Sequence, residues 1–341
     1  MEVKCFILIS LFSFFFYFFI FNRRKKIGLK FGTIDIPKNN RQIHKIPVPL
    51  TGAYSVLVVF ILILLNNLLF NFFHSDYNLI IISSIFAFFL GIFDDKFDLR
   101  PYIKIFYLSL IYLVISSFSD NLTIFKFYSF TYDTFIHLNE FYIIFSLLCI
   151  LLLTNSLNLA DGINGIAVGI IFFLLLYITR IYNSEFNIYV FLILANLILI
   201  FFHNYNNKHF LGNSGILMLS TFVGLLVIKF FNDNLSNPSS TNNVEQIFLI
   251  FLLPGIDMLR LFLERIIKNK NAFKADTNHI HHLLIKNYSL KKSLLIYFSI
   301  LNFPILLYFY LNTKIIFFIF LKILIYIFAI LYLKNKKIKY F

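Results

Sequence analysis

Apolar residues dominate this chain in repeated blocks of about 15 to 22, each followed by a short polar stretch. Blocks of that length fit α-helices that cross a hydrocarbon layer about 30 Å thick. A membrane β-barrel would instead show short segments in which apolar and polar residues alternate. The pattern therefore predicts an all-α, polytopic integral membrane protein with about eleven transmembrane helices, which we expect at residues 4–21, 49–73, 78–93, 102–118, 140–154, 163–181, 186–203, 214–231, 244–256, 291–311 and 314–333.

The composition supports a membrane location. Of the 341 residues, 60% are hydrophobic and 13% are charged, a balance that the surface of a water-soluble protein of this size could not accommodate. The first apolar run lacks the cleavage site of a signal peptide, so we expect it to remain as the first helix. Cys5 and Cys149 lie in apolar runs and suggest neither a disulfide framework nor a thiolate metal site. We expect a single membrane-embedded domain over residues 1–341, because no long linker and no internal repeat divides the chain.

Lysine and arginine residues collect on one side of the predicted bundle. If the N-terminus lies outside, most of them fall in the inside segments, which are the C-terminal tail and residues 22–48, 94–101, 155–162, 204–213 and 257–290. The outside connections hold little beyond Lys126, Arg180, Lys229 and Lys314. The positive-inside rule then predicts an external N-terminus, a cytoplasmic C-terminus and an active face formed by the inside segments. Attraction to the anionic inner leaflet explains the net charge of +14, so no nucleic acid partner is needed.

Unusual polar sequences occur on this predicted cytoplasmic side. The first is "GIFDDKFDLRP", where Asp94 and Asp98 lie one helical turn apart and Asp95 is three residues from Asp98. Carboxylates that converge repel each other unless a proton or a cation lies between them, which favours a hard, oxygen-binding ion such as Mg²⁺. A solvated helix end, with Lys96 and Arg100 as ordinary neighbours, also explains these residues.

The second polar sequence, "TNSLNLADGING", separates two apolar runs. Asn155, Asn158 and Asp161 occupy neighbouring parts of one face if the fifth helix continues through them. Gly162 and Gly165 would permit the backbone to approach a bound phosphate or nucleotide closely. An Asn-Asp-Gly turn is the simpler explanation, although a turn needs only about three or four of these residues.

Two further polar sequences follow. In "HNYNNKHFLGNSG", Asn213 could cap the eighth helix, whose free N–H groups could bind an anion. After Pro254, Asp257, Arg260 and Glu264 share one face of a predicted amphipathic helix at the membrane interface. Nearby histidines suggest either a metal site or donors that face a diphosphate, and they are His279, His281 and His282.

These sequences, in this order and on one side of the membrane, resemble the polyprenyl-phosphate N-acetylhexosamine-1-phosphate transferases of glycosyltransferase family 4. The resemblance runs from Asp35 to about Leu284. "DIPKNNRQIHKIPVPLTGA" is similar to the first cytoplasmic loop of the family, "DDKFDL" to its acidic motif, "NSLNLADGINGIA" to its Asn-Asp-Gly motif and "FLGNSG" to its Gly-Asp-x-Gly motif. "PGIDMLRLFLERI" followed by "FKADTNHIHHLL" resembles the Pro-Asp-Arg and His-x-His-His region of the N-acetylglucosamine branch.

The resemblance implies a reaction and its partners. A HexNAc-1-phosphate, expected to be that of GlcNAc, would pass from a UDP-HexNAc to undecaprenyl phosphate with release of UMP. The expected place is the cytoplasmic face of a bacterial inner membrane, as the first membrane step of cell-surface polysaccharide synthesis. Mg²⁺ is the implied metal, with Mn²⁺ as an alternative. A homodimer is left open.

The resemblance also implies roles for residues. The acidic pair that meets the lipid phosphate and Mg²⁺ falls on Asp94 and Asp95. The motif that cradles the nucleoside and its phosphates falls on Asn155, Asn158, Asp161 and Gly162. The basic motif that faces the diphosphate falls on His279, His281 and His282. These acids and histidines are the expected catalytic residues, and further phosphate contacts are expected from Lys45 and Arg260.

Two departures from the family pattern bear on activity. The family usually has a metal-binding aspartate where this chain has Asn213, and an arginine is common where it has Thr277. An amide oxygen can coordinate Mg²⁺ but lacks the charge that holds it. We therefore expect Asp94, Asp95 and Asn213 to form a weakened metal site in a functional enzyme.

Other functions remain open at this point. A phospho-N-acetylmuramoyl-pentapeptide transferase is the nearest alternative, but that branch tends to carry a run of three histidines and fewer spans. A multi-span secondary transporter is the alternative from another class. Transporters place their sites near the midplane on broken helices, whereas the acids and histidines here lie at predicted helix ends on one side. A catalytically silent family member, suggested by Asn213, is the third alternative.

Overall fold

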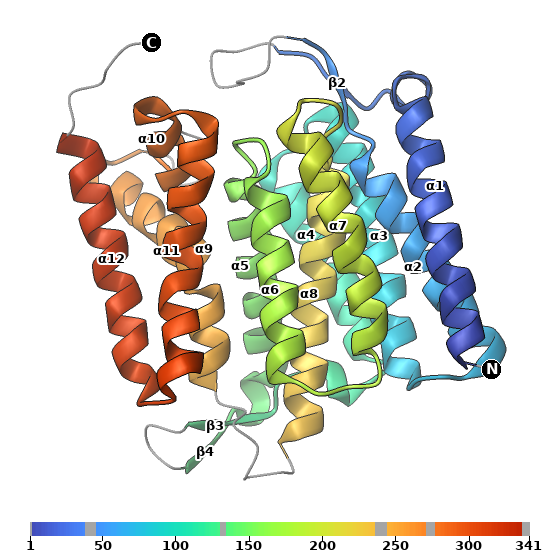
Figure 1. Cartoon of the computed structure of the whole chain (residues 1–341). Helices are drawn as coiled ribbons and strands as arrows, with labels where there is room; N and C mark the ends of the chain where they lie inside the picture. Colours follow the sequence, from blue (N-terminus) through green and yellow to red (C-terminus); the bar gives the residue numbers. More distant parts are fainter. Residues whose placement is uncertain (1, 38–45, 130–133, 236–243, 271–276, 336–341) are drawn as a thin grey trace.

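The computed structural model describes residues 2–37, 46–129, 134–235, 244–270 and 277–335. Helices make up most of this structure (Figure 1). The longer ones are α1 (Glu2–Phe31), α2 (Gly52–Phe70), α3 (Ser75–Phe97), α5 (Tyr142–Ala160), α7 (Asn187–Tyr205), α8 (Gly212–Asn234), α9 (Val244–Ile267), α11 (Leu290–Leu311) and α12 (Ile315–Asn335). The shorter ones are α4 (Pro101–Ser116), α6 (Ile166–Ile181), α10 (Ile280–Asn287) and the 3-10 helices η1 (Asp120–Leu122) and η2 (Asn139–Phe141).

Each predicted transmembrane segment overlaps a helix. Within the described residues, nine helices are long and apolar enough to cross a membrane, so the chain is a polytopic membrane protein. The prediction of about eleven spans also counted α4 and α6, which are apolar but have 16 residues each. At about 1.5 Å per residue such helices reach about 24 Å, short of a hydrocarbon layer of about 30 Å.

Helix α8 lies among the other helices (Figure 1), and its most apolar stretch is completely buried. A helix that is apolar on all sides can be enclosed by neighbours in this way. Along α3 the contact is very close, because a Cβ on Gly91 would lie 2.3 Å from the Ser214 Cα. The packing of α3 against α8 therefore brings the end of α3 to the first turn of α8.

Three predicted boundaries are wrong by six residues or more. The first span was expected to end at residue 21, but α1 continues to Phe31. Residues 155–162 were expected to form an inside loop, but α5 continues to Ala160, as the alternative of a continuing helix required. The span expected at 244–256 continues as a single helix to Ile267, although Pro254 lies inside it. Proline removes one helical hydrogen bond, and the packing of α9 against α5, α11 and α12 keeps the helix continuous. Asp257 therefore belongs to the bundle rather than to a separate interfacial helix.

The described parts of the segments predicted to face the cytoplasm lie at the same end of the bundle, at the top of Figure 1, where the end of α1, strand β2 and α10 are seen. There β1 (Ile34–Asp35) pairs antiparallel with β2 (Val48–Pro49). The loop before α8 joins this hairpin, since the Phe210 N–H donates to the Pro49 carbonyl at 2.9 Å. A second hairpin, β3 (Lys126–Ser129) with β4 (Thr134–His137), lies at the opposite end. The all-α prediction is thus correct except for these short hairpins.

Candidate active site

The adjacent acids at the end of α3 face different partners. Asp94 is 2% exposed, and its carboxylate accepts hydrogen bonds from the Leu99 N–H at 2.9 Å and from the Lys104 Nζ at 3.0 Å. Asp98 ends the helix in a left-handed conformation, with a φ of 51°, and the chain then returns as α4. A buried carboxylate is stable only when paired, so Asp94 and Lys104 hold each other. The sequence did not indicate that Lys104 would be the partner of Asp94.

Asp95 binds the first turn of α8. Its two carboxylate oxygens accept hydrogen bonds from the N–H groups of Asn213 at 2.7 Å and of Ser214 at 3.0 Å. Unpaired N–H groups give a helix N-terminus a partial positive charge, which an anion stabilises. Gly212 has a φ of 73°, and a Cβ there would lie 2.9 Å from an Asp95 oxygen. The structure thereby joins the acidic sequence to the sequence around Asn213.

Asp161 ends α5, and the residue is open to solvent on one side while protein atoms surround its carboxyl group. Desolvation by the surrounding protein raises the pKa of this carboxyl to about 7, and the negative charges of Asp95 and Asp35 act in the same direction. The charges of Asp35 and Asp95 therefore reach Asp161 at this end of the bundle. Sequence reasoning missed Asp35, although it is the one acid in the loop sequence that resembles the family.

Gly162 joins the asparagine-rich turn to the histidines. A Cβ on Gly162 would lie 2.6 Å from the Nε2 atoms of both His281 and His282, so only a glycine lets these rings come so close. The His281 and His282 ring centroids are 4.4 Å apart. His281 is 1% exposed, and its Nε2 has no hydrogen-bond partner. Burial lowers the pKa of His281 well below its usual value, with a further contribution from His282, which favours a neutral ring.

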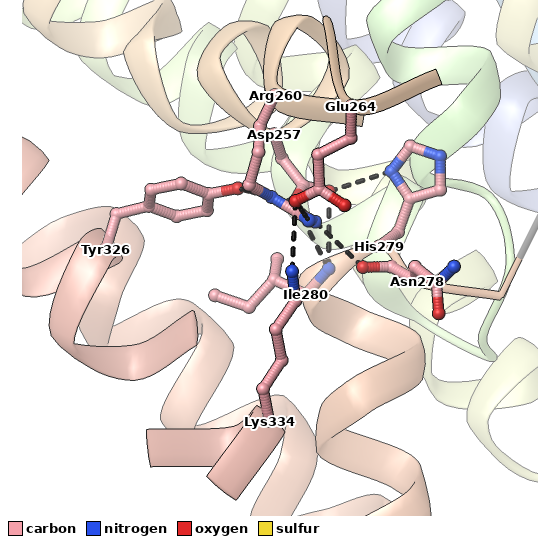
Figure 2. A network of polar contacts seen from close by, with 8 residues as sticks. All are labelled: Asp257, Arg260, Glu264, Asn278, His279, Ile280, Tyr326 and Lys334. Atoms are coloured by element: carbon pink, nitrogen blue, oxygen red, sulfur yellow. Dashed lines mark hydrogen bonds and ion pairs between the residues drawn. The ribbon is translucent and has the colours of Figure 1, made fainter. Parts of the chain in front are cut away.

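A network of polar contacts supports the histidine segment from α9 (Figure 2). Asp257 is 5% exposed and accepts hydrogen bonds from the His279 Nδ1 at 2.8 Å and from the Ile280 N–H at 3.2 and 3.3 Å. The carboxylate thus holds the start of α10 in place. His279 was predicted at the site, whereas the sequence did not indicate that Asp257 would be its partner.

Arg260 is committed to internal partners. Its guanidinium donates to Asp257 at 3.0 Å, to Glu264 at 2.9 Å, to the Asn278 carbonyl at 2.7 Å and to the Tyr326 hydroxyl at 2.6 Å (Figure 2). These bonds use the donors that a phosphate would need. Its predicted role as a phosphate contact is untested, and the geometry favours a role in holding the histidine segment. Lys45, the other predicted phosphate contact, lies outside the described residues.

The predicted asparagines lie on the last turns of α5. Asn155 is exposed and its Nδ2 lies 3.4 Å from the Met258 Sδ, while the Oδ1 of Asn158 is buried without a hydrogen-bond partner. Asn204, which sequence reasoning missed, fixes the turn after them by accepting a hydrogen bond from the Gly165 N–H at 2.7 Å. The free Asn158 oxygen is therefore one turn away from Asp161 and Gly162, where a ligand could meet it.

Comparison with known proteins finds relatives in sequence. The sequence model of glycosyl transferase family 4 covers residues 77–231, from α3 to α8. The chain matches this family in sequence over these residues. Relatives named undecaprenyl-phosphate alpha-N-acetylglucosaminyl 1-phosphate transferase occur in Thermotoga maritima, 28% identical over 76% of each chain, and in Yersinia pestis, 25% identical over 77% of this chain and 72% of the relative. The Escherichia coli K12 protein of that name is 25% identical over 82% of this chain and 76% of its own length.

The match to glycosyl transferase family 4 confirms the resemblance and supports an enzyme of the glycosyl-1-phosphate transferase type. It also implies dependence on a divalent metal. Within the described residues, no three His, Cys, Asp or Glu side chains lie close enough together to hold a metal alone. Mg²⁺, however, is usually bound by one or two carboxylates together with substrate phosphates. The oxygens of Asp95 and Asp161, with their mutual repulsion, fit that requirement.

Proposed function

We propose that this enzyme transfers GlcNAc-1-phosphate from UDP-GlcNAc to undecaprenyl phosphate and releases UMP. One observation carries the proposal: Asp161 lies next to Gly162, where the histidines pack. The charges of Asp95 and Asp35 also reach Asp161. The names of the relatives from three bacteria support the choice of sugar and lipid. We place the reaction at the cytoplasmic face of a bacterial inner membrane, because the predicted basic segments lie at that end of the bundle.

The chemistry requires charge neutralisation and alignment. An oxygen of the lipid phosphate forms a bond to the β-phosphorus of the UDP-sugar, and the bond from that phosphorus to the bridging oxygen breaks, so UMP leaves with the electron pair. Both reactants are anions, and repulsion between them has to be offset. When bound, Mg²⁺ or Mn²⁺ supplies positive charge to the phosphates. We assign its protein ligands to Asp95, Asp161 and the amide oxygen of Asn213.

Asp94 is given a different part in this proposal. Unlike Asp95, it pairs with a cation, and its hydrogen bond from Lys104 places an ammonium group at the first turn of α4. Lys104 is 19% exposed in its side chain, so a phosphate can still reach it. We propose that Asp94 positions Lys104 as a contact for the lipid phosphate, while Asp95 faces the metal.

The histidines and asparagines complete the site. A neutral His281 can donate one hydrogen bond or accept one at its free Nε2, which suits contact with a phosphate oxygen. Asn155 and Asn158 supply amide groups on the adjoining face of α5, where a nucleoside or sugar offers donors and acceptors. Gly162 places no side chain between the histidines and the asparagines. A diphosphate can therefore contact both groups.

Release of UMP tests the proposal. Purified protein in lipid nanodiscs should release UMP from UDP-GlcNAc only when undecaprenyl phosphate and Mg²⁺ are both present. UDP-GalNAc and UDP-MurNAc-pentapeptide, assayed in parallel, decide the sugar. Asp95→Asn and Asp161→Asn should abolish release. Solute uptake that survives these substitutions, with no UMP formed from any of the sugars, would establish a transporter instead.

A further inference from the structure

Helix α12 reaches the histidine segment through Tyr326. This tyrosine is 2% exposed, and it lies after the part of the chain that the family model matches. Its hydroxyl receives a hydrogen bond from the Arg260 Nε at 2.6 Å and lies 2.8 Å from the Asp257 Oδ1 (Figure 2). Arginine can only donate, so the hydroxyl proton of Tyr326 must point at Asp257. The direction of both hydrogen bonds is thereby determined.

The two oxygens of Asp257 are divided between different tasks. Oδ1 accepts from Tyr326 and from the Arg260 Nη2, and Oδ2 lies 2.8 Å from the His279 Nδ1. A carboxylate accepts and does not donate, so the His279 Nδ1 carries a proton. In a neutral ring, Nε2 then holds the lone pair.

The remaining nitrogen of His279 lies across the ring from the Nδ1 that contacts Asp257. Its Nε2 is buried and has no hydrogen-bond partner, and the residue as a whole is 4% exposed. The His279 ring stacks on His281, with centroids 5.4 Å apart and planes inclined by 11°, and His281 in turn packs at Gly162. An orphaned buried nitrogen in a stack of imidazoles is suited to a ligand group.

Two further contacts keep α12 against α9. The Lys322 Nζ donates to the Leu249 carbonyl at 2.9 Å, one helical turn before Tyr326, and the Lys334 Nζ donates to Glu264 at 3.0 Å. These contacts lie on either side of Tyr326 along α12. The position of the tyrosine hydroxyl is therefore set by the packing of two helices rather than by a mobile loop.

We infer that Tyr326 is a positioning residue of the transfer reaction: by donating to Asp257 it fixes the ring and the tautomer of His279, whose Nε2 meets the substrate diphosphate. This inference rests on the proposed function for the identity of the substrate. It adds a residue of α12 to a site that otherwise comes from the segments between β1 and α10. Partners of this kind around a functional histidine commonly change activity by about 10-fold when removed.

The test compares Tyr326→Phe with Tyr177→Phe, a matched control that also loses one buried tyrosine hydrogen bond, from Tyr177 to Asn302 at 2.9 Å. Tyr326→Phe should lower kcat about 10-fold and leave KM for UDP-GlcNAc within about twofold. Tyr177→Phe should leave both constants unchanged while showing a similar loss of thermal stability. Equal effects of the two substitutions on kcat would overturn the inference.

A second background separates positioning from general support of the fold. His279→Asn keeps an amide donor where Nδ1 lies and removes Nε2, so Tyr326→Phe should have no further effect on kcat in this variant. A loss of about 10-fold that persists in the Asn background would show that Tyr326 does not act through Nε2.

One readout does not depend on turnover. The ¹⁵N resonances of His279, identified by their loss in His279→Asn, should report a proton on Nδ1 and a lone pair on Nε2 in the unaltered protein. Tyr326→Phe should give a mixture of tautomers. An unchanged tautomer would contradict the positioning role. The tautomer can be measured even if the protein releases no UMP. Absence of UMP release would instead refute the proposed function.

Discussion

Replacing Gly162 by alanine tests the meeting of the α5 turn with the histidines. The added Cβ would lie 2.6 Å from the Nε2 atoms of His281 and His282 and 2.8 Å from the His282 Cε1. Ordinary contact between such atoms needs about 3.5 Å, so the rings or the turn must move by about 0.9 Å. The backbone of Gly162 does not have a positive φ, so the alanine itself causes no backbone strain. The contact alone should produce the effect.

A displacement of about 1 Å in a reacting group typically costs about 100-fold in rate. We therefore expect Gly162→Ala to lower the kcat for UMP release about 100-fold while the protein stays folded. Gly255→Ala is the matched control, because no atom lies within 4 Å of the Cβ it would add, and it should retain full activity. Gly162→Ala with the activity of the unaltered enzyme would refute the proposal that the histidines contact the substrate beside this turn.

Further predictions concern the acids and the metal. Lys104→Met leaves Asp94 buried without its cation and should lower the unfolding free energy by about 3 kcal/mol. Thermal or denaturant unfolding measures this loss. A double variant that also carries Asp94→Asn should recover part of it. Because the folded-state pKa of Asp161 is raised to about 7, above an unfolded value of about 4, its contribution to stability falls as the pH rises between these values. Asp161→Asn should therefore gain stability relative to the unaltered protein from about pH 4 to about pH 7, and a parallel pH dependence of both proteins would contradict this. Chelation should abolish UMP release, and Asn213→Asp should lower the half-saturating Mg²⁺ concentration about 10-fold; an unchanged concentration would exclude Asn213 as a ligand.

The sequence was informative wherever the signal is local. Apolar blocks predicted the helices because each helix has to be long enough for a membrane and satisfies its own backbone hydrogen bonds. The acids, asparagines, glycines and histidines were found because such residues are unusual beside long apolar runs. The helix boundaries were less accurate, since the apolar block that ends before Thr154 does not reveal that α5 extends to Ala160.

Partners across the chain could not be predicted in the same way. Asp94 and Asp95 are adjacent in sequence and were assigned one role, yet they lie at successive positions of a helix and point in different directions. Asp94 faces Lys104, and Asp95 faces the N–H groups at the start of α8. Which acid faces which partner depends on how α3 packs against α4 and α8.

The sequence by itself determined the class of the protein, its membrane helices and the residue types of its candidate site. Only the tertiary structure decided that Asp35 acts on Asp161, that Gly162 admits two histidines and that Tyr326 of α12 holds Asp257. The physical reason is that hydrophobic periodicity records whether a residue is buried. Charge pairing and hydrogen-bond direction depend on which distant side chain lies within about 3 Å, and helix packing alone sets that distance.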